Sequence, residues 1–281
     1  MPYAAEISRS NPACFLFVID QSGSMEEPFG SAAGESSQKK ATALADIVNR
    51  LLANIAIRCS KGEGVRDYFH LGVLGYGTQV GSAFGGALSG RDLVPISELA
   101  NNPLRVEERI KKEDDGAGGL LERKVKFPVW FEPVANGGTP MVQALGHART
   151  IVQSWLASHA SGFPPIVFNI TDGESTDGEP SAAADQLKSL GNADGSVLVF
   201  NIHLSSAHGQ PIVFPASETQ LPNDYARLLF RMSSELPPQM RATATQEGLG
   251  NSESSRGMAF NSDLVCLVRL LEIGTRPSNL R

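Results

Sequence analysis

Two short polar segments of this 281-residue chain carry oxygen-bearing side chains at close spacing. The first reads Asp-Gln-Ser-Gly-Ser and places a carboxylate on Asp20 beside hydroxyls on Ser22 and Ser24. The second, Asn-Ile-Thr-Asp-Gly-Glu, contributes a further carboxylate on Asp172. Hard divalent cations such as magnesium prefer oxygen ligands of these kinds. The residue types therefore predict a cation site.

A third polar segment, Asn-Gly-Gly-Thr-Pro, ends at Pro140 just before a stretch with helical periodicity. Thr139 is suited to the N-cap of that helix and Pro140 to its first position. Two carboxylates and three hydroxyls, completed by water, would fill most of a magnesium shell and leave room for an outside ligand. Each motif alone is common in turns and helix starts, so the prediction depends on all three lying together.

Apolar runs that alternate with helical patterns supply the elements that must position these groups. Residues 13–19 form a continuous apolar run, which is typical of a strand covered on both faces of a parallel sheet. Further strands are expected at 70–76, 166–170, 197–204 and 257–260, and helices at 44–55, 141–156, 182–190, 225–232 and 264–271. This order predicts a three-layer, doubly wound α/β fold, Rossmann-like, with a mostly parallel central sheet flanked by helices. The carboxyl ends of its strands are where functional groups gather.

Two regions interrupt this alternation without ending it, so we expect one domain at residues 11–275, followed by a short tail at 276–281. The first, residues 81–133, is interpreted as an elaboration containing a short helix at 104–110 and a mixed charge run at 107–115 on a solvated helix face. The second, residues 205–222, is interpreted as an ordered crossing loop, because apolar residues are interspersed among its prolines.

The composition limits the partners and the compartment. A formal net charge of −6 argues against broad binding to nucleic acid or anionic lipid. Cys14, Cys59 and Cys266 are widely separated, which predicts buried, reduced thiols and no disulfide framework. No secretory signal pattern and no apolar run long enough to span a bilayer is visible, so we expect a cytoplasmic protein that binds no membrane.

Taken together and in this order, the motifs at Asp20, Ser22 and Ser24, at Thr139, and at Asp172 resemble the metal-ion-dependent adhesion site of the von Willebrand factor type A family. The resemblance covers residues 11–275, and the segment 81–133 departs from the family pattern. It implies that Ser22 and Ser24 bind Mg²⁺ or Mn²⁺ directly, that Thr139 does so directly or through water, and that Asp20 and Asp172 act directly or through waters.

The same resemblance implies a binding function and no catalysis. In this family a carboxylate of a partner protein completes the metal's coordination, so the expected partner presents an Asp or Glu side chain. Within the family the chain looks most like the bacterial intracellular members grouped with tellurite-resistance and stress operons. That likeness suggests a scaffold or adaptor whose partners are ATPases, protein kinases or phosphatases encoded nearby.

An alternative is a magnesium-dependent phosphohydrolase of the haloacid dehalogenase type, which also starts from an Asp after the first strand. That class needs a second Asp two residues later, where this chain has Ser22, and a lysine near the later acidic motif, where the nearest downstream is Lys188. The acidic stretch 172–179 does not fit an EF-hand calcium loop. Its carboxylates, with that of Asp20, are instead expected to give one end of the sheet a negative field.

Overall fold

A computed structural model describes residues 2–29, 38–114, 120–205, 210–250 and 252–275. Its main sheet has eight strands in the order β15-β16-β14-β11-β1-β6-β7, with β8 beside β6. The bounds are β1 Ala13–Asp20, β6 Phe69–Tyr76, β7 Val80–Ser82, β8 Val94–Pro95, β11 Ile166–Thr171, β14 Leu198–Leu204, β15 Ile212–Val213 and β16 Met258–Ser262. The five central strands pair in parallel and the three short ones pair antiparallel, which confirms the predicted mostly parallel sheet.

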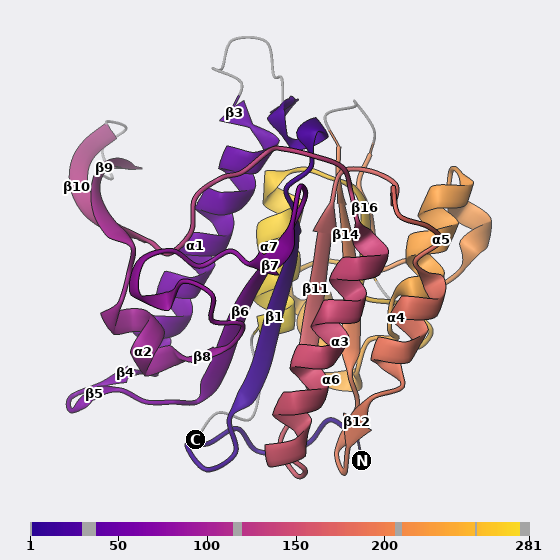
Figure 1. Ribbon diagram of the computed structural model, residues 1–281, viewed down its shortest axis with the longest axis horizontal. Coiled ribbons are helices and arrows are strands. Elements are labelled where there is room, and N and C mark those ends of the chain that lie inside the picture. Colours follow the sequence, from indigo (N-terminus) through magenta and orange to yellow (C-terminus); the bar gives the residue numbers. More distant parts are fainter. Residues whose placement is uncertain (1, 30–37, 115–119, 206–209, 251, 276–281) are drawn as a thin grey trace.

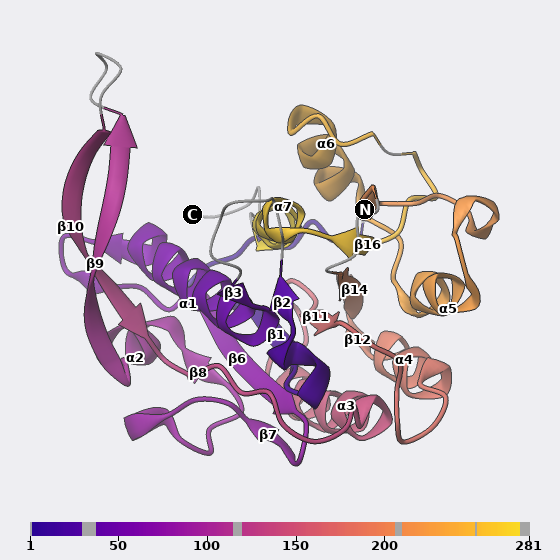
Figure 2. The same ribbon diagram turned by 90° about the horizontal axis from the view of Figure 1, so that it is seen from above.

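Helices cover both faces of this sheet and complete three layers (Figure 2). Successive residues of β1 point to opposite faces, and all eight are buried. Phe15 and Phe17 enter a core with α1, α2, α6 and α7, whereas Leu16 and Val18 enter a second core with α3, α4 and α5. The bounds are α1 Lys40–Cys59, α2 Ile96–Asn101, α3 Met141–Ser158, α4 Ser181–Lys188, α5 Asp224–Met232, α6 Pro238–Gln246 and α7 Leu264–Thr275.

All ten expected elements of the layers are present, with ends shifted by a few residues, because their apolar patterns are long and regular. The short helices α2 and α6 were not predicted. Within residues 205–222, the described part holds β15 and a 3₁₀ helix, η3, at Glu218–Gln220. The three cysteines are buried and free. No helix in the described ranges is long and apolar enough to cross a membrane.

The prediction of a helix at residues 104–110 is wrong. The chain there enters β9, Arg105–Asp114, which pairs antiparallel with β10, Leu120–Val129, in a separate two-stranded sheet. We call this hairpin the arm; it extends outward beside α1 and α2 (Figure 1). The charges at 107–114 therefore lie on a strand, not on a helix face. The pairing joins residues as far apart in the sequence as Arg105 and Val129, which a local helical pattern does not reveal.

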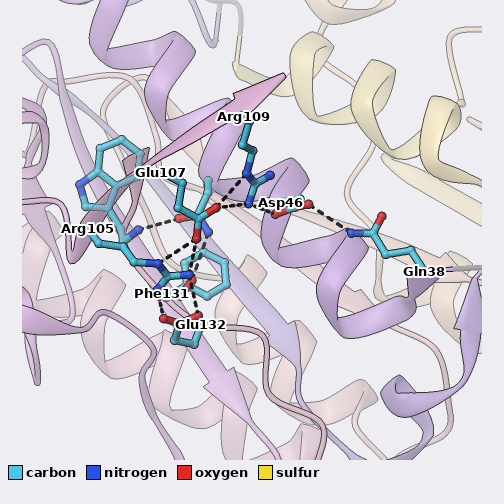
Figure 3. A network of polar contacts seen from close by, with 9 residues as sticks. Gln38, Asp46, Arg105, Glu107, Arg109, Phe131 and Glu132 are labelled. Atoms are coloured by element: carbon cyan, nitrogen blue, oxygen red, sulfur yellow. Dashed lines mark hydrogen bonds and ion pairs between the residues drawn. The ribbon is translucent and has the colours of Figure 1, made fainter. Parts of the chain in front are cut away.

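The base of the arm is held by buried and half-buried polar contacts (Figure 3). The Asn49 side chain of α1 accepts from Trp130 N at 2.8 Å and donates to Phe131 O at 3.1 Å. Arg109 of β9 donates to Asp46 of α1 at 2.9 Å, with its guanidinium 3.6 Å from the ring centre of Phe127. The arm is thus fixed to the body at its root, on the side of α1.

Short elements complete the chain and connect the layers. Three antiparallel pairs of two-residue strands join β2 with β3, β4 with β5, and β12 with β13. Two further 3₁₀ helices, η1 and η2, follow β1 and β7. Their bounds are β2 Pro28–Phe29, β3 Gln38–Lys39, β4 Ser60–Lys61, β5 Gly64–Val65, β12 Gly191–Asn192, β13 Gly195–Ser196, η1 Gly23–Glu26 and η2 Gly86–Leu88. The predicted tail, residues 276–281, lies outside the described residues.

Candidate functional site

The loop after β1 turns tightly around the Asp20 carboxylate. Asp20 is 1% exposed, and its Oδ1 accepts the backbone N–H of Ser22 at 2.8 Å. The Ser22 hydroxyl lies 3.0 Å from the Ser24 hydroxyl, which places three of the predicted oxygen donors in one turn. Ser22 is buried, whereas Ser24 sits on η1 and is exposed. The loop therefore presents the hydroxyls in a row from the interior to the surface.

Asp172 meets this loop because β1 and β11 are parallel neighbours whose carboxyl ends share one edge of the sheet. The Ser24 hydroxyl donates to Asp172 Oδ1 at 2.7 Å. A second link runs between the strand ends, where the Thr171 hydroxyl donates to Asp20 Oδ2 at 2.8 Å. The structure thus brings together Asp20, Ser22, Ser24 and Asp172, as the sequence predicted.

Thr139 lies in a loop that two backbone hydrogen bonds tie to the turn after β1. Gly23 N donates to Gly137 O at 3.0 Å, and Asn136 N donates to Gln21 O at 2.6 Å. Thr139 itself is 5% exposed. The third motif therefore reaches the same edge of the sheet as the other two.

The prediction that Thr139 caps the following helix is wrong. Helix α3 begins at Met141, and the Asp177 carboxylate accepts from its first-turn groups, Val142 N at 3.0 Å and Gln143 N at 2.9 Å. Thr139 instead exchanges two hydrogen bonds with Thr176: its N–H donates to the Thr176 hydroxyl, and its carbonyl accepts from Thr176 N, each at 2.9 Å. The cap comes from a distant loop, which leaves the Thr139 hydroxyl outside that task.

Glycine makes the close approach of these loops possible. A Cβ on Gly77 would lie 2.5 Å from Asn136 O and 2.7 Å from Gln21 O. Gly137 adopts a φ of +86°, and a Cβ there would lie 2.5 Å from Thr78 N. These two positions have structural reasons to be glycine that the sequence alone did not reveal.

Lys40, the first residue of α1, is the site residue that sequence reasoning missed. Its Nζ lies 2.9 Å from Asp172 Oδ2 and 2.7 Å from Glu27 Oε2. The Lys40 and Asp172 side chains are 5% and 0% exposed. Only one sequence signal was available, a lysine at a helix start, where the helix dipole disfavours positive charge.

Burial and neighbouring charges set the protonation of the site. Burial raises the pKa of Asp20, hydrogen bonds from Ser22 and Thr171 oppose the rise, and the nearby charge of Asp172 adds to it. Burial alone would lower the pKa of Lys40, but its hydrogen bonds to Asp172 and Glu27 outweigh burial and raise it. Lys40 is therefore a charged ammonium at neutral pH.

An aromatic wall borders the site on the β14 side. The rings of His203 and Phe260 stack with centroids 4.4 Å apart, and the Tyr225 hydroxyl donates to Gly173 O. Burial lowers the pKa of His203 to about 4, so its imidazole is neutral at physiological pH. This wall adds no charge to the site.

The donor set fits a hard divalent cation with one restriction. Hydroxyl and carboxylate oxygens converge here, but Asp172 Oδ2 is already paired with Lys40. Within the described residues, no group of three or more His, Cys, Asp and Glu side chains could hold a metal ion, so hydroxyls would have to supply the remaining ligands. The expected negative field is also weaker than the acidic stretch suggests, since Asp177 caps α3 and Glu179 accepts from Ser181 N.

No protein-family model matches the sequence, and no curated protein is detectably related to it. Among solved structures, proximal thread matrix protein 1 from the mussel byssus, which has a zinc-occupied metal-ion-dependent adhesion site (MIDAS) motif, is 18% identical over 98% of this chain and 50% of its own, with a TM-score of 0.44. Manganese-loaded TRAP protein of Plasmodium vivax is 15% identical over 96% of this chain and 76% of its own, with a TM-score of 0.40.

A third, the ArnB paralog VWA2 of Sulfolobus acidocaldarius, is 12% identical over 69% of this chain and 35% of its own, with a TM-score of 0.36. This chain spans half the length of the mussel protein. Identities and TM-scores of this size do not show family membership. By its own strand order, the chain is a three-layer, doubly wound α/β protein with a mostly parallel central sheet.

Proposed function

We propose that this chain is a von Willebrand factor type A protein-binding module that holds Mg²⁺ or Mn²⁺ with Asp20, Ser22, Ser24, Thr139 and Asp172. The observation that carries the proposal is the hydrogen bond from Ser24 to Asp172, since it joins two oxygen-rich motifs that are 148 positions apart in the sequence. The tie between the Gly137 loop and Gly23 adds the third motif.

In such a site, some residues would bind the ion directly and others would hold the loop in place. A bound divalent ion supplies a positive centre that attracts an anionic group from outside. The hydroxyls of Ser22 and Ser24 are neutral, so they offer ligands without cancelling that charge. Asp20 has both carboxylate oxygens in hydrogen bonds to protein groups, so its main work is to hold the turn through Ser22 and to link it to Thr171.

The partner proposed for this site is a protein that presents an Asp or Glu side chain. Exposed Ser24, at the outer end of the hydroxyl row, supports access from solvent. The finer assignment, an intracellular bacterial adaptor for an ATPase, kinase or phosphatase, rests on the resemblance of the motifs alone.

No observation favours the phosphohydrolase alternative. That class needs a second Asp two residues after the first, and this position holds Ser22, whose hydroxyl lies 3.0 Å from that of Ser24. Lys188, which that alternative would use, lies on α4, pairs with Asp185 at 2.9 Å and donates to Arg231 O at 2.8 Å.

Calorimetric titration with Mn²⁺ tests the metal site. Ser24→Ala should weaken Mn²⁺ binding by about tenfold or more, because it removes one hydroxyl donor and the hold on Asp172. The matched control is Ser217→Ala, whose exposed hydroxyl bonds to that of Thr219 at 2.8 Å. Equal Mn²⁺ affinity in wild type and Ser24→Ala would contradict the proposal.

A pull-down from native lysate in Mg²⁺ and in EDTA tests the partner. The expected partner is captured only with Mg²⁺ and is lost by the Ser24→Ala bait. Replacement of one Asp or Glu on the identified partner by its amide should also abolish capture. Capture that survives EDTA, or survives every such replacement, speaks against recognition through the metal.

A further inference from the structure

A buried ammonium contacts one of the proposed metal ligands, Asp172. Lys40 Nζ makes two charge-assisted contacts, at 2.9 Å to Asp172 and at 2.7 Å to Glu27. Its side chain is 5% exposed, whereas that of Glu27 is 62% exposed. The desolvated partner of Lys40 is therefore Asp172. Water weakens the ion pair between Lys40 and the exposed Glu27.

The position of Lys40 is unfavourable for the helix on which it stands. As the first residue of α1 it faces the positive end of the helix dipole, where an acidic side chain would stabilise and a cation destabilises. The first turn of α1 contains no acidic residue. Burying a lysine there also costs free energy unless it is well paired. The charge-assisted contacts of Lys40 with Asp172 and Glu27 offset both disadvantages.

Asp172 is shared between two donors on opposite oxygens. Its Oδ1 accepts from Ser24 and its Oδ2 contacts Lys40, so each carboxylate oxygen has a protein donor. Without Lys40, this fully buried carboxylate would keep one hydroxyl partner among the described residues, Ser24, beside the second buried carboxylate of Asp20. Lys40 thus supplies the charge balance that a bound cation would otherwise provide.

We propose that Lys40 is a resident cation of the site, which neutralises Asp172 when no metal is bound and competes with a divalent ion for that carboxylate. Two consequences follow. The protein folds without metal, and it binds metal more weakly than its oxygen donors alone would allow. The competition rests on the proposed function, whereas the neutralisation does not.

The test compares wild type with Lys40→Met, which keeps the length of the side chain and removes its charge. The matched control is Lys39→Met, because Lys39 is the preceding residue, is 56% exposed and pairs with Glu26 at the surface. Calorimetric Mn²⁺ titration and melting temperature in EDTA and in Mn²⁺ are measured for each. Neither readout depends on a partner protein.

Lys40→Met should bind Mn²⁺ about tenfold or more tightly than wild type, because a like charge leaves the site and Asp172 Oδ2 becomes free. It should also melt lower than wild type in EDTA and recover in Mn²⁺, whereas Lys39→Met should match wild type. A folded Lys40→Met that binds Mn²⁺ no more tightly than wild type overturns the inference. If Lys40→Met does not fold in either buffer, Lys40→Gln is judged by the same criteria.

Failure of this inference is distinguishable from failure of the proposed function. Mn²⁺ binding by wild type without tighter binding by the Lys40 variant leaves the proposed function and overturns the competition. Binding by the variant but not by wild type supports the resident cation and shows that the native chain is not a metal site. Binding by neither overturns both.

Discussion

The edge of the sheet that carries the candidate site, here called the site edge, and the arm both contain charged side chains. The charged pair at the site edge is buried, whereas the pair on the outer arm is exposed. At the site edge, the side chains of Asp172 and Lys40 are buried, and Asp172 accepts hydrogen bonds from Ser24 and Lys40, which are both distant from it along the chain. On the arm, Lys124 and Glu108 pair at 3.0 Å with side chains that are 77% and 65% exposed. Water competes for the second pair and is excluded from the first, so similar geometry has very different energetic weight.

This contrast means that burial, not the number of charges, marks the region where single substitutions have large effects. The base of the arm belongs with the site edge in this respect, because Asn49 is 2% exposed and holds two backbone groups. Four substitutions test that ordering, from buried charge to exposed ion pair.

The largest loss of stability is expected for Asp172→Ala. It leaves the buried Lys40 ammonium with only the exposed Glu27, so the free energy of unfolding in EDTA should fall by about 3–5 kcal/mol. Urea denaturation followed by circular dichroism measures the change. Glu27→Gln is the control and should cost much less, since that carboxylate is largely hydrated. A loss for Asp172→Ala as small as that for Glu27→Gln would break the distinction between the two regions.

Asn49→Ala should come next, with a loss of about 2–3 kcal/mol. The substitution leaves Trp130 N–H and Phe131 C=O buried without their partner, and an unpaired buried polar group is costly. The same urea experiment measures it. Asn54→Ala, on the same helix and partly exposed, serves as the control. If Asn49→Ala behaves like its control, the base of the arm is not anchored by these contacts.

Asp177→Ala should lower stability by about 1 kcal/mol at neutral pH, through loss of the cap on α3. Burial alone raises the pKa of Asp177, but hydrogen bonds from the backbones of Gln143 and Val142 outweigh burial and lower the pKa from its ordinary 3.8. The stabilising contribution is therefore complete well above pH 3.8 and is lost as the pH falls through the lower pKa of the folded state.

The pH dependence of this contribution is tested by the difference in free energy of unfolding between wild type and Asp177→Ala, measured from pH 7 to pH 3. The difference should stay constant near neutral pH and shrink at the acid end. A difference that grows on acidification contradicts the assignment of Asp177 as the cap.

The smallest effect is expected on the outer arm. Glu108→Ala removes the partner of Lys124 but should change the free energy of unfolding by no more than about 0.5 kcal/mol. Added salt should reduce this small difference further, because mobile ions screen an exposed pair. A loss above 1 kcal/mol would mean that the arm's surface ion pairs act together, and the contrast with the site edge would then weaken.

Regular elements were predictable where one local pattern was decisive. The eight buried residues of β1 form an apolar run, and α1 and α3 show helical spacing over many turns. The arm was not predictable in this way, since β9 is rich in charged residues and pairs with a strand that lies further along the chain. α2, with only six residues, is too short to give a clear period.

The candidate site was predictable as a set of motifs but not as a set of contacts. Asp20, Ser22, Ser24 and Asp172 followed from polar residues after apolar strands, because parallel strands end at a common edge. Thr139 was assigned to the right loop and to the wrong task, since the cap of α3 comes from Asp177. No spacing rule connects that residue with Val142.

The sequence by itself determined the layered α/β fold and which strand ends carry oxygen donors, because both follow from local periodicity and from the geometry of parallel sheets. Only the tertiary structure decided that Lys40, 132 positions away from Asp172, lies against that carboxylate. It also decided that Arg105–Asp114 and Leu120–Val129 pair as the two strands of the arm. Both outcomes depend on pairing and packing between segments distant along the chain, which local patterns do not encode.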